Sequence, residues 1–332
     1  MVLVTGGTGF LGAYIIRELV NKGYRVKAIR RSNSTIPFFV PAAVFAQIEW
    51  FEADILDVIG VAEAMEGVDT VIHSAAKVSY DPADKKELYQ TNIDGTANVV
   101  NTALELNIPR FVYISSVAAV GRTKLGEQID ETKTWEDKFA NSHYAVSKHK
   151  AEMEIWRAIG EGLNAVILNP STILGFGDWN TSSCAIFRNI YEEFPYYTTG
   201  INGFVSVEDT ARATVRLMES GIQAERFIVN GDNWSYQQLF DTIARNFHKK
   251  PPGKQVTPFM AALAWRVEKI KSVFSGKHPL LSKETARIAQ TKTYFDNRKI
   301  LAALPGFSFT PLDTTIQEAC AGYLAHLSTG NQ

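Results

Sequence analysis

The first twelve residues, MVLVTGGTGFLG, constrain the fold more than any other part of the chain. A strand-like run at 2–5 leads into Gly6, Gly9 and Gly12, and a helical pattern follows at 11–21. Between a strand and a helix, glycines at this spacing permit a tight turn, close approach of the backbone to a pyrophosphate, and close helix packing. The N–H groups at the start of the helix would bind the anion. The segment predicts a dinucleotide site, and a structural glycine-rich turn is the alternative.

Strand-like and helical segments alternate through the first half of the chain. Strands that are apolar on both faces and separated by helices indicate a parallel sheet with helices on both sides. The fold class we expect is therefore α/β, a Rossmann-type doubly wound parallel sheet. The expected strands are 2–5, 25–29, 49–53, 70–75, 110–116 and 164–170, and the expected helices are 11–21, 58–65, 86–106 and 142–159.

The alternation ends near Gly175. Residues 176–200 are expected to form a loop and a short helix, 203–221 a strand and a helix, and 226–232 one more strand, with mainly helices after Trp234. We expect two domains from this change of pattern. They are a dinucleotide-binding domain of 1–170 plus about 203–230, and a smaller, mostly helical substrate-binding domain of about 171–202 plus 231–332.

Composition and charge exclude several classes of function. With 45% hydrophobic and 21% charged residues and a net charge of −1, the chain is typical of a soluble globular protein without a nucleic-acid or membrane partner. We expect no signal peptide and no metal site. Cys184 and Cys320 lie far apart, which favours a reducing cytoplasmic location over a disulfide framework. The amphipathic stretch at 259–274 is expected to be a helix over the substrate pocket, with a membrane-surface helix as the alternative.

The end of the second expected strand bears on the choice of cofactor. An acidic residue there would bind the ribose 2′-hydroxyl of NAD, but this chain reads VKAIRRSNS. Arg30 and Arg31 place guanidinium groups where a 2′-phosphate would lie, so NADP(H) is favoured and NAD(H) is the second choice. Two solvated arginines are the alternative. Asp54 and Ile55, after the third strand, are candidates for the adenine edge, where a solvent-facing aspartate is the competing interpretation.

A second group of residues indicates proton-transfer chemistry. Tyr144 and Lys148 are four residues apart and share one face of the predicted helix at 142–159. A nearby ammonium would lower the pKa of the tyrosine and let it exchange a proton with a carbonyl or hydroxyl. Ser116, at the carboxyl end of a strand, could donate a hydrogen bond to an oxyanion. Asn92 could bend its helix and hold a water in a proton relay. A surface Tyr–Lys pair and a surface asparagine are the alternatives.

These segments resemble the extended short-chain dehydrogenase/reductases over nearly the whole chain. The motifs that carry the resemblance are TGGTGFLG, HSAA at 73–76, NIDGTANVV, YISS, YAVSK and FVSVEDTARA. The resemblance implies that Ser116, Tyr144 and Lys148 are catalytic, that Asn92 supports them, and that helices 86–106 and 142–159 form a homodimer. The expected cofactor contacts are Gly6, Thr8, Gly9, Phe10, Leu11, Gly12, Arg30, Arg31, Asp54, Ile55, Ala75, Ala76, Lys77, Tyr144, Lys148, Asn169, Pro170 and Ser171.

Departures from the family's motifs separate its branches. Val117 and Ala118 follow the serine where the family's dehydratases have an Asp-Glu pair. The segment NPSTILG carries Asn169 and Thr172 where sugar-nucleotide enzymes often have arginine and asparagine. The first feature leaves no acid–base pair for dehydration. The NPSTILG segment and the arginines after the second strand resemble the dihydroflavonol-reductase branch, which implies NADPH-dependent reduction of an aldehyde or ketone, including flavonoid- or steroid-like compounds. An NAD(P)-dependent nucleotide-sugar epimerase and a non-catalytic NADP-binding sensor are the alternatives.

Aromatic residues are concentrated at 176–204, which holds eight of them. An aromatic wall suits a flat or apolar carbonyl substrate. Packing of the small domain's core is the alternative for at least half of these side chains. The expected substrate contacts are Ser116, Trp179 and Tyr80.

Overall fold

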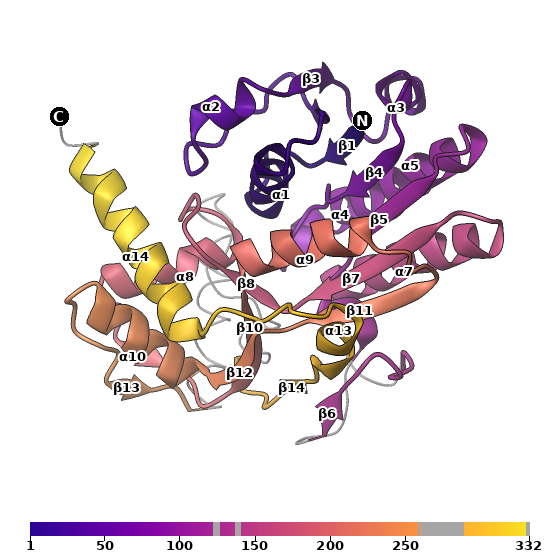
Figure 1. The fold of residues 1–332 in the computed structure, drawn as a ribbon. Coiled ribbons are helices and arrows are strands. Elements are labelled where there is room, and N and C mark those ends of the chain that lie inside the picture. Colours follow the sequence, from indigo (N-terminus) through magenta and orange to yellow (C-terminus); the bar gives the residue numbers. More distant parts are fainter. Residues whose placement is uncertain (122–126, 137–140, 258–259, 261–288, 330–332) are drawn as a thin grey trace.

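The structure is a computed structural model of the chain. It describes all residues except 122–126, 137–140, 258–259, 261–288 and 330–332, which are drawn in grey in Figure 1. The amphipathic stretch at 259–274 lies outside the described residues except for Met260. The prediction of a helix over the substrate pocket therefore stays a prediction.

A seven-stranded sheet forms the centre of the molecule, in the order β11-β7-β5-β4-β1-β2-β3 (Figure 1). Every neighbouring pair in it is parallel. The seven strands correspond to those expected from the sequence, so the predicted Rossmann-type fold is confirmed. They are β1 (Val2–Thr5), β2 (Val26–Arg30), β3 (Glu49–Glu52), β4 (Thr70–His73), β5 (Arg110–Ile114), β7 (Ala165–Pro170) and β11 (Glu225–Val229).

Alternate residues of the strands enter two separate cores because successive side chains point to opposite faces of a sheet. Val2 and Val4 belong to one core and Leu3 to the other. The first core is covered by α1 (Phe10–Asn21) and α9 (Val207–Glu219), and the second by α3 (Val58–Met65), α5 (Gly95–Glu105) and α7 (His143–Gly160). The strand order changes direction between β1 and β4, and ligands bind at the carboxyl ends of strands near such a point.

The predicted helix at 86–106 is interrupted. It consists of α4 (Lys85–Tyr89), a π-helical segment (Gln90–Asp94) and α5. The π-helical segment contains Asn92, so the helix is irregular at the asparagine where a bend was predicted. Such segments occur frequently at functional sites.

A third core lies among the C-terminal elements. α8 (Ala185–Tyr191), α10 (Tyr236–Asn246) and α14 (Leu312–Thr329) contribute to it, and they gather on one side of the molecule in Figure 1. The strand expected at the start of 203–221 is present as β10 (Ile201–Ser206), but it pairs with β8 (Thr172–Leu174) and β12 (Asp232–Ser235) in a separate sheet. The shorter elements are α2 (Ala42–Phe45), α6 (Val117–Val120), α13 (Arg298–Ala303), β6 (Gln128–Ile129), β9 (Tyr196–Tyr197), β13 (Lys254–Gln255) and β14 (Tyr294–Phe295), with 3₁₀ turns at Pro82–Asp84 and Ser182–Cys184.

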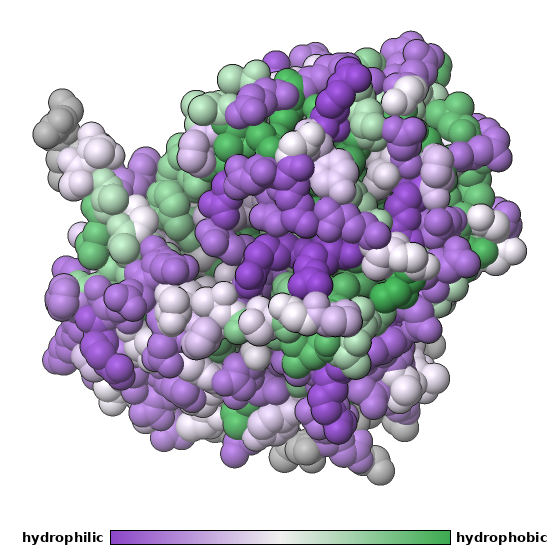
Figure 2. Space-filling view, in the orientation of Figure 1, coloured by the Kyte–Doolittle hydropathy of each residue, from purple (hydrophilic) through white to green (hydrophobic). Residues whose placement is uncertain are grey.

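The surface shown in Figure 2 mixes hydrophilic and hydrophobic residues. Among the described residues, no helix combines the length and the apolar character that crossing a bilayer requires. Both cysteines are free and buried.

Candidate active site

The glycine turn between β1 and α1 is packed so closely that side chains would not fit. Gly6 has a φ of +71°, and a Cβ there would lie 2.7 Å from the backbone nitrogen of Ala75. A Cβ at Gly12 would overlap the carbonyl oxygen of Gly6 and lie 2.8 Å from its carbonyl carbon. In the described part of the chain, no side chain caps the N-terminus of α1, and its first turn carries no acidic residue. The backbone N–H groups in the first turn of α1 can therefore donate hydrogen bonds to a bound anion.

Polar atoms without partners lie where the sequence predicts cofactor contacts. Asn169 Oδ1 and Ser171 Oγ are buried at the carboxyl end of β7, and neither has a hydrogen-bond partner within the described residues. Buried polar atoms are normally paired, so two such atoms suit a ligand with polar groups. Together with the glycine turn, they fit a nicotinamide dinucleotide laid across the carboxyl ends of the strands.

Ser116 and Tyr144 lie together beyond the end of β5. Ser116 caps α6, where its Oγ accepts a hydrogen bond of 3.2 Å from the nitrogen of Ala118. Burial raises the pKa of Tyr144 above its ordinary value, and a hydrogen bond from Ser116 lowers it in part. The ring of Tyr80 lies 5.6 Å from that of Tyr144, centroid to centroid. The structure therefore brings together three of the residues predicted to act on the substrate.

Lys148 lies one turn further along α7 and is 2% exposed. Its Nζ donates hydrogen bonds to Tyr113 Oη at 3.0 Å and to the carbonyl oxygen of Ile114 at 2.9 Å. Burial lowers the pKa of Lys148 to about 7, and the neighbouring Glu152 raises it in part. The expectation that Lys148 would lower the pKa of Tyr144 is wrong for the protein alone, because burial of the phenol outweighs the effects that favour its ionised form. Tyr144 is a protonated phenol at neutral pH.

Asn92 connects the loop after β4 to α7. Its Oδ1 accepts a hydrogen bond of 2.7 Å from the nitrogen of Lys77. Its Nδ2 donates to the carbonyl oxygen of Lys77 and to Ser147 Oγ, both at 2.9 Å. Both N–H donors of the amide are thus used within the protein. Asn92 thus holds the start of α7 in place. The sequence predicts a different role for it, that of holding a water in a proton relay.

Arg30 is the last residue of β2, and Arg31, Asp54, Ile55 and Lys77 lie in the loops at the carboxyl ends of the strands. The Arg30 guanidinium lies over the Trp50 ring at 5.7 Å, and Arg31 is exposed. Asp54 Oδ1 accepts a hydrogen bond from the nitrogen of Leu56, and Ile55 is buried against Gly95. The ammonium of Lys77 forms ion pairs with Asp84 and Glu87, so its side chain is already engaged in the protein alone.

Sequence reasoning missed Glu152, a buried carboxylate one turn beyond Lys148. It accepts hydrogen bonds from Ser115 Oγ at 2.6 Å and from Asn169 Nδ2 at 2.8 Å, and it forms an ion pair with Arg226 at 3.2 Å. Asn169 Nδ2 also donates to the carbonyl oxygen of Ser116 at 3.0 Å. Glu152 therefore holds the backbone of Ser116 through Asn169. Its position four residues after Lys148, on the same helix face, was the available signal.

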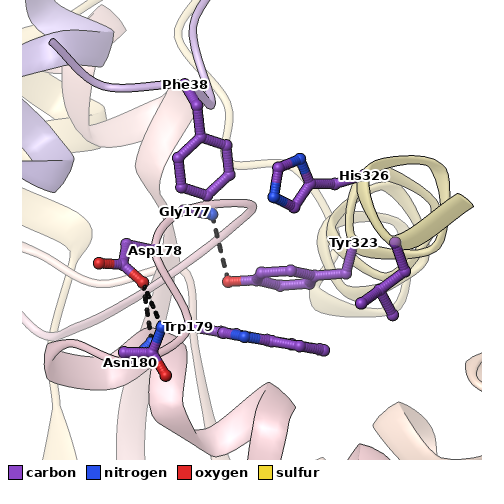
Figure 3. A pocket seen from close by; sticks show the side chains of 8 residues that line it. Phe38, Gly177, Asp178, Trp179, Asn180, Tyr323 and His326 are labelled. Atoms are coloured by element: carbon purple, nitrogen blue, oxygen red, sulfur yellow. Dashed lines mark hydrogen bonds between the residues drawn. The ribbon is translucent and has the colours of Figure 1, made fainter. Parts of the chain in front are cut away.

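Trp179, a predicted substrate contact, packs against the third core, among the C-terminal elements. Its ring stacks on that of Tyr323 of α14, with the centroids 5.4 Å apart (Figure 3). The ring of Tyr191 lies 5.6 Å from it. Trp179 lines a cavity of about 100 Å³ together with Phe38, Tyr323 and His326, among others (Figure 3). Five of the eight aromatic residues at 176–204 belong to the third core or pack against it, as the alternative interpretation expected: Phe176, Trp179, Phe187, Tyr191 and Phe204.

Comparisons with known proteins agree with this geometry. The model of the NAD dependent epimerase/dehydratase family matches residues 2–230. A putative dihydroflavonol 4-reductase of Synechocystis sp. is 31% identical over 310 residues, which cover 91% of this chain and 88% of that protein. The crystal structure of gox2253 has 28% identity and a TM-score of 0.83, with 98% of each chain covered.

A more distant structure shares the fold. UDP-glucose 4-epimerase of Thermus thermophilus, solved in complex with NAD, has 19% identity and a TM-score of 0.75, with 97% of this chain and 98% of that chain covered. The chain therefore belongs to the NAD-dependent epimerase/dehydratase family, as an NAD(P)-dependent enzyme of the extended short-chain dehydrogenase/reductase type in its dihydroflavonol-reductase-like branch.

Proposed function

We propose that this enzyme uses NADPH to reduce a carbonyl group of a small molecule to an alcohol. The observation that carries the proposal is that a buried Tyr144 with a raised pKa lies beside Ser116 and one helical turn from Lys148. A proton donor to a carbonyl oxygen must be protonated at the working pH, and the raised pKa of Tyr144 meets this condition. Val117 and Ala118 offer no acid–base pair for dehydration.

Each side chain then has a distinct role. A bound reduced nicotinamide would supply the hydride that the carbonyl carbon receives. Ser116 donates its hydroxyl to the carbonyl oxygen and stabilises the charge that develops there. Tyr144 gives its phenolic proton to the same oxygen, which completes the alcohol and leaves a phenolate. Lys148 has a third N–H donor beyond those used by Tyr113 and Ile114, and this donor would bind the ribose while the ammonium stabilises the phenolate.

A screen for NADPH oxidation over aldehydes, ketones and flavanonols tests this function. The purified protein is expected to consume NADPH with at least one of these carbonyl compounds. The rival function, nucleotide-sugar epimerisation, returns the cofactor to its starting state in each cycle. Protein that copurifies with NAD⁺, interconverts nucleotide sugars and consumes no NADPH would replace the reductase assignment with that of an epimerase.

The preference for NADPH rests on Arg30 and Arg31 at the end of β2. Arg31→Glu is expected to raise the Kd for NADP⁺ about 10- to 100-fold, because a charge-assisted contact to the 2′-phosphate is replaced by repulsion. The Kd for NAD⁺ should stay within a few-fold. Arg25→Glu is the matched control, since Arg25 is exposed just before β2 begins, at the opposite edge of the sheet. Titration calorimetry with both dinucleotides measures the change, and an equal loss of both affinities contradicts the preference.

Two further parts of the proposal concern the assembled protein and its location. Homodimerisation through α5 and α7 is supported by Met153, an apolar side chain on α7 that is 41% exposed. Light scattering of the purified protein tests it. A cytoplasmic location is supported by the two buried, unpaired cysteines.

A further inference from the structure

A row of buried polar side chains ends on the lysine that the mechanism uses. Thr5, His73 and Tyr113 are the last or nearly last residues of β1, β4 and β5, and they are register partners across these strands. The ring of His73 stacks on that of Tyr113 at 5.6 Å. With Thr96 of α5 and Lys148 of α7, they form what we call the buried polar row, in which no member is more than 2% exposed.

The members of the row are joined by hydrogen bonds. Tyr113 Oη accepts from Lys148 Nζ at 3.0 Å, and Thr96 lies close enough to Tyr113 to lower its pKa in part. The Thr96 hydroxyl lies 3.0 Å from His73 Nε2. His73 Nδ1 lies 2.7 Å from Thr5 Oγ1, which accepts a hydrogen bond of 3.1 Å from the nitrogen of Ala75. That nitrogen is the atom packed against Gly6 in the glycine turn, so the row connects the dinucleotide turn with Lys148.

The row has a hydrogen-bond direction that suits a charged lysine. An ammonium has donors only, so Tyr113 must accept from it. Beyond Tyr113, Thr96 can donate to His73 Nε2, and His73 Nδ1 can donate to Thr5. This order requires His73 to be neutral, and burial, followed by the charge of Lys148, lowers the pKa of His73 to about 3. Burial also raises the pKa of Tyr113 well above its ordinary value, so it stays a phenol.

Among the residues that the structure describes, four titratable groups face Lys148. Glu152 faces it from the next turn of α7, Tyr144 from the preceding turn, Tyr113 from β5 and His73 from β4. The Glu152 carboxylate is occupied by Ser115, Asn169 and Arg226. On the sheet side, Lys148 is therefore held by the neutral oxygens of Tyr113 and Ile114.

We propose that Tyr113 is a positioning residue that holds the ammonium of Lys148 from the sheet side and is itself oriented by Thr96 and His73. The lysine is thereby fixed with its third donor directed away from the sheet, toward the ribose and Tyr144. This inference rests on the role of Lys148 in the proposed function. The contribution of Tyr113 to the charged form of Lys148 can nevertheless be measured without turnover.

The test compares thermal unfolding of the wild-type protein with that of Tyr113→Phe at pH 6 and pH 9. The variant keeps the ring and removes the hydroxyl that accepts from Lys148. Because the folded Lys148 has a pKa of about 7, it is charged at pH 6 and neutral at pH 9. Loss of the Tyr113 hydroxyl destabilises the folded protein when Lys148 is charged. The drop in Tm that the substitution causes should therefore be larger at pH 6 than at pH 9, by roughly 1 to 3 °C.

Two further variants make the result specific. Tyr14→Phe removes another buried tyrosine hydroxyl, which donates to the carbonyl oxygen of Phe176 at 2.7 Å, and its drop in Tm should be equal at both pH values. Thr96→Val keeps the Tyr113 hydroxyl and breaks the next link, so it should show the pH effect at smaller size. If Tyr113→Phe does not fold, Thr96→Val carries the test. Equal drops at pH 6 and pH 9 in the row variants overturn the proposal.

Turnover gives the second readout. In the pH profile of kcat/KM for carbonyl reduction, the alkaline limb reflects loss of the charge on Lys148. In Tyr113→Phe this limb should move to lower pH by about one unit, and the KM for NADPH should rise. Tyr14→Phe should leave this limb in place. A wild-type protein that reduces no carbonyl compound contradicts the proposed function while the unfolding test still decides the role of Tyr113. An active Tyr113→Phe with an unmoved limb contradicts the positioning role alone.

Discussion

Tyr144→Phe is expected to lower kcat for carbonyl reduction by roughly a thousandfold or more and to leave the Kd for NADPH within a few-fold. The change removes the phenolic proton that completes the alcohol, and general acid catalysis contributes about 10²–10⁴-fold. The hydrogen bond to Ser116 is lost as well, so the serine holds the carbonyl oxygen less precisely. The ring remains, and with it the packing against Tyr80. Single-turnover measurement of NADPH oxidation, with titration calorimetry for the dinucleotide, separates chemistry from binding.

Tyr89→Phe is the control for this substitution. Tyr89 Oη is hydrogen-bonded to His143 Nδ1 at 3.1 Å, at the first residue of the helix that carries Tyr144. Its loss perturbs the same helix without touching the proposed proton donor, so kcat should stay within a few-fold of the wild type. Comparable turnover in Tyr144→Phe and Tyr89→Phe would remove Tyr144 from the mechanism and leave the chain as a dinucleotide-binding fold without an assigned acid.

The seven strands of the central sheet could be predicted because their local pattern is strong. Strands buried on both faces read as short apolar runs, and each run here is bounded by a helix or a turn. β10 shows where this reasoning fails. Its sequence predicts a strand that returns to the central sheet, yet it pairs with β8 and β12 in a separate sheet. Strand partners are set by the path of the whole chain, which a local pattern does not contain.

In the candidate site, too, some residues could be predicted from the sequence and others could not. The glycine turn and the Tyr144–Lys148 pair are defined by spacing along one turn or one helix, so the sequence reveals them. His73 and Tyr113 look like ordinary strand residues, and they meet only because β4 and β5 are neighbours in register. The pKa of Tyr144 was predicted in the wrong direction because spacing supplies the neighbouring charge but not the degree of burial, and burial is the larger effect here.

Gly12→Ala is expected to weaken dinucleotide binding at least about a hundredfold and to destabilise the fold by about 1–3 kcal/mol. The added methyl group would overlap the carbonyl of Gly6, which is backbone and is itself packed against Ala75. The start of α1 must therefore move away from β1, and its N–H groups would no longer face the position of the pyrophosphate. Thermal unfolding with and without NADP⁺ measures both effects, because a ligand that binds more tightly raises Tm more at the same concentration.

Gly160→Ala separates this effect from that of an added methyl group in general. Gly160 is the last residue of α7, and a Cβ there would meet no heavy atom of the described residues within 4 Å. Alanine favours a helix over glycine by up to about 1 kcal/mol, so this variant should be as stable as the wild type or more so, with the same affinity for NADP⁺. If Gly12→Ala behaves like Gly160→Ala in both measurements, the backbone of the first turn is not what holds the diphosphate, and the cofactor site must be sought elsewhere at the carboxyl ends of the strands.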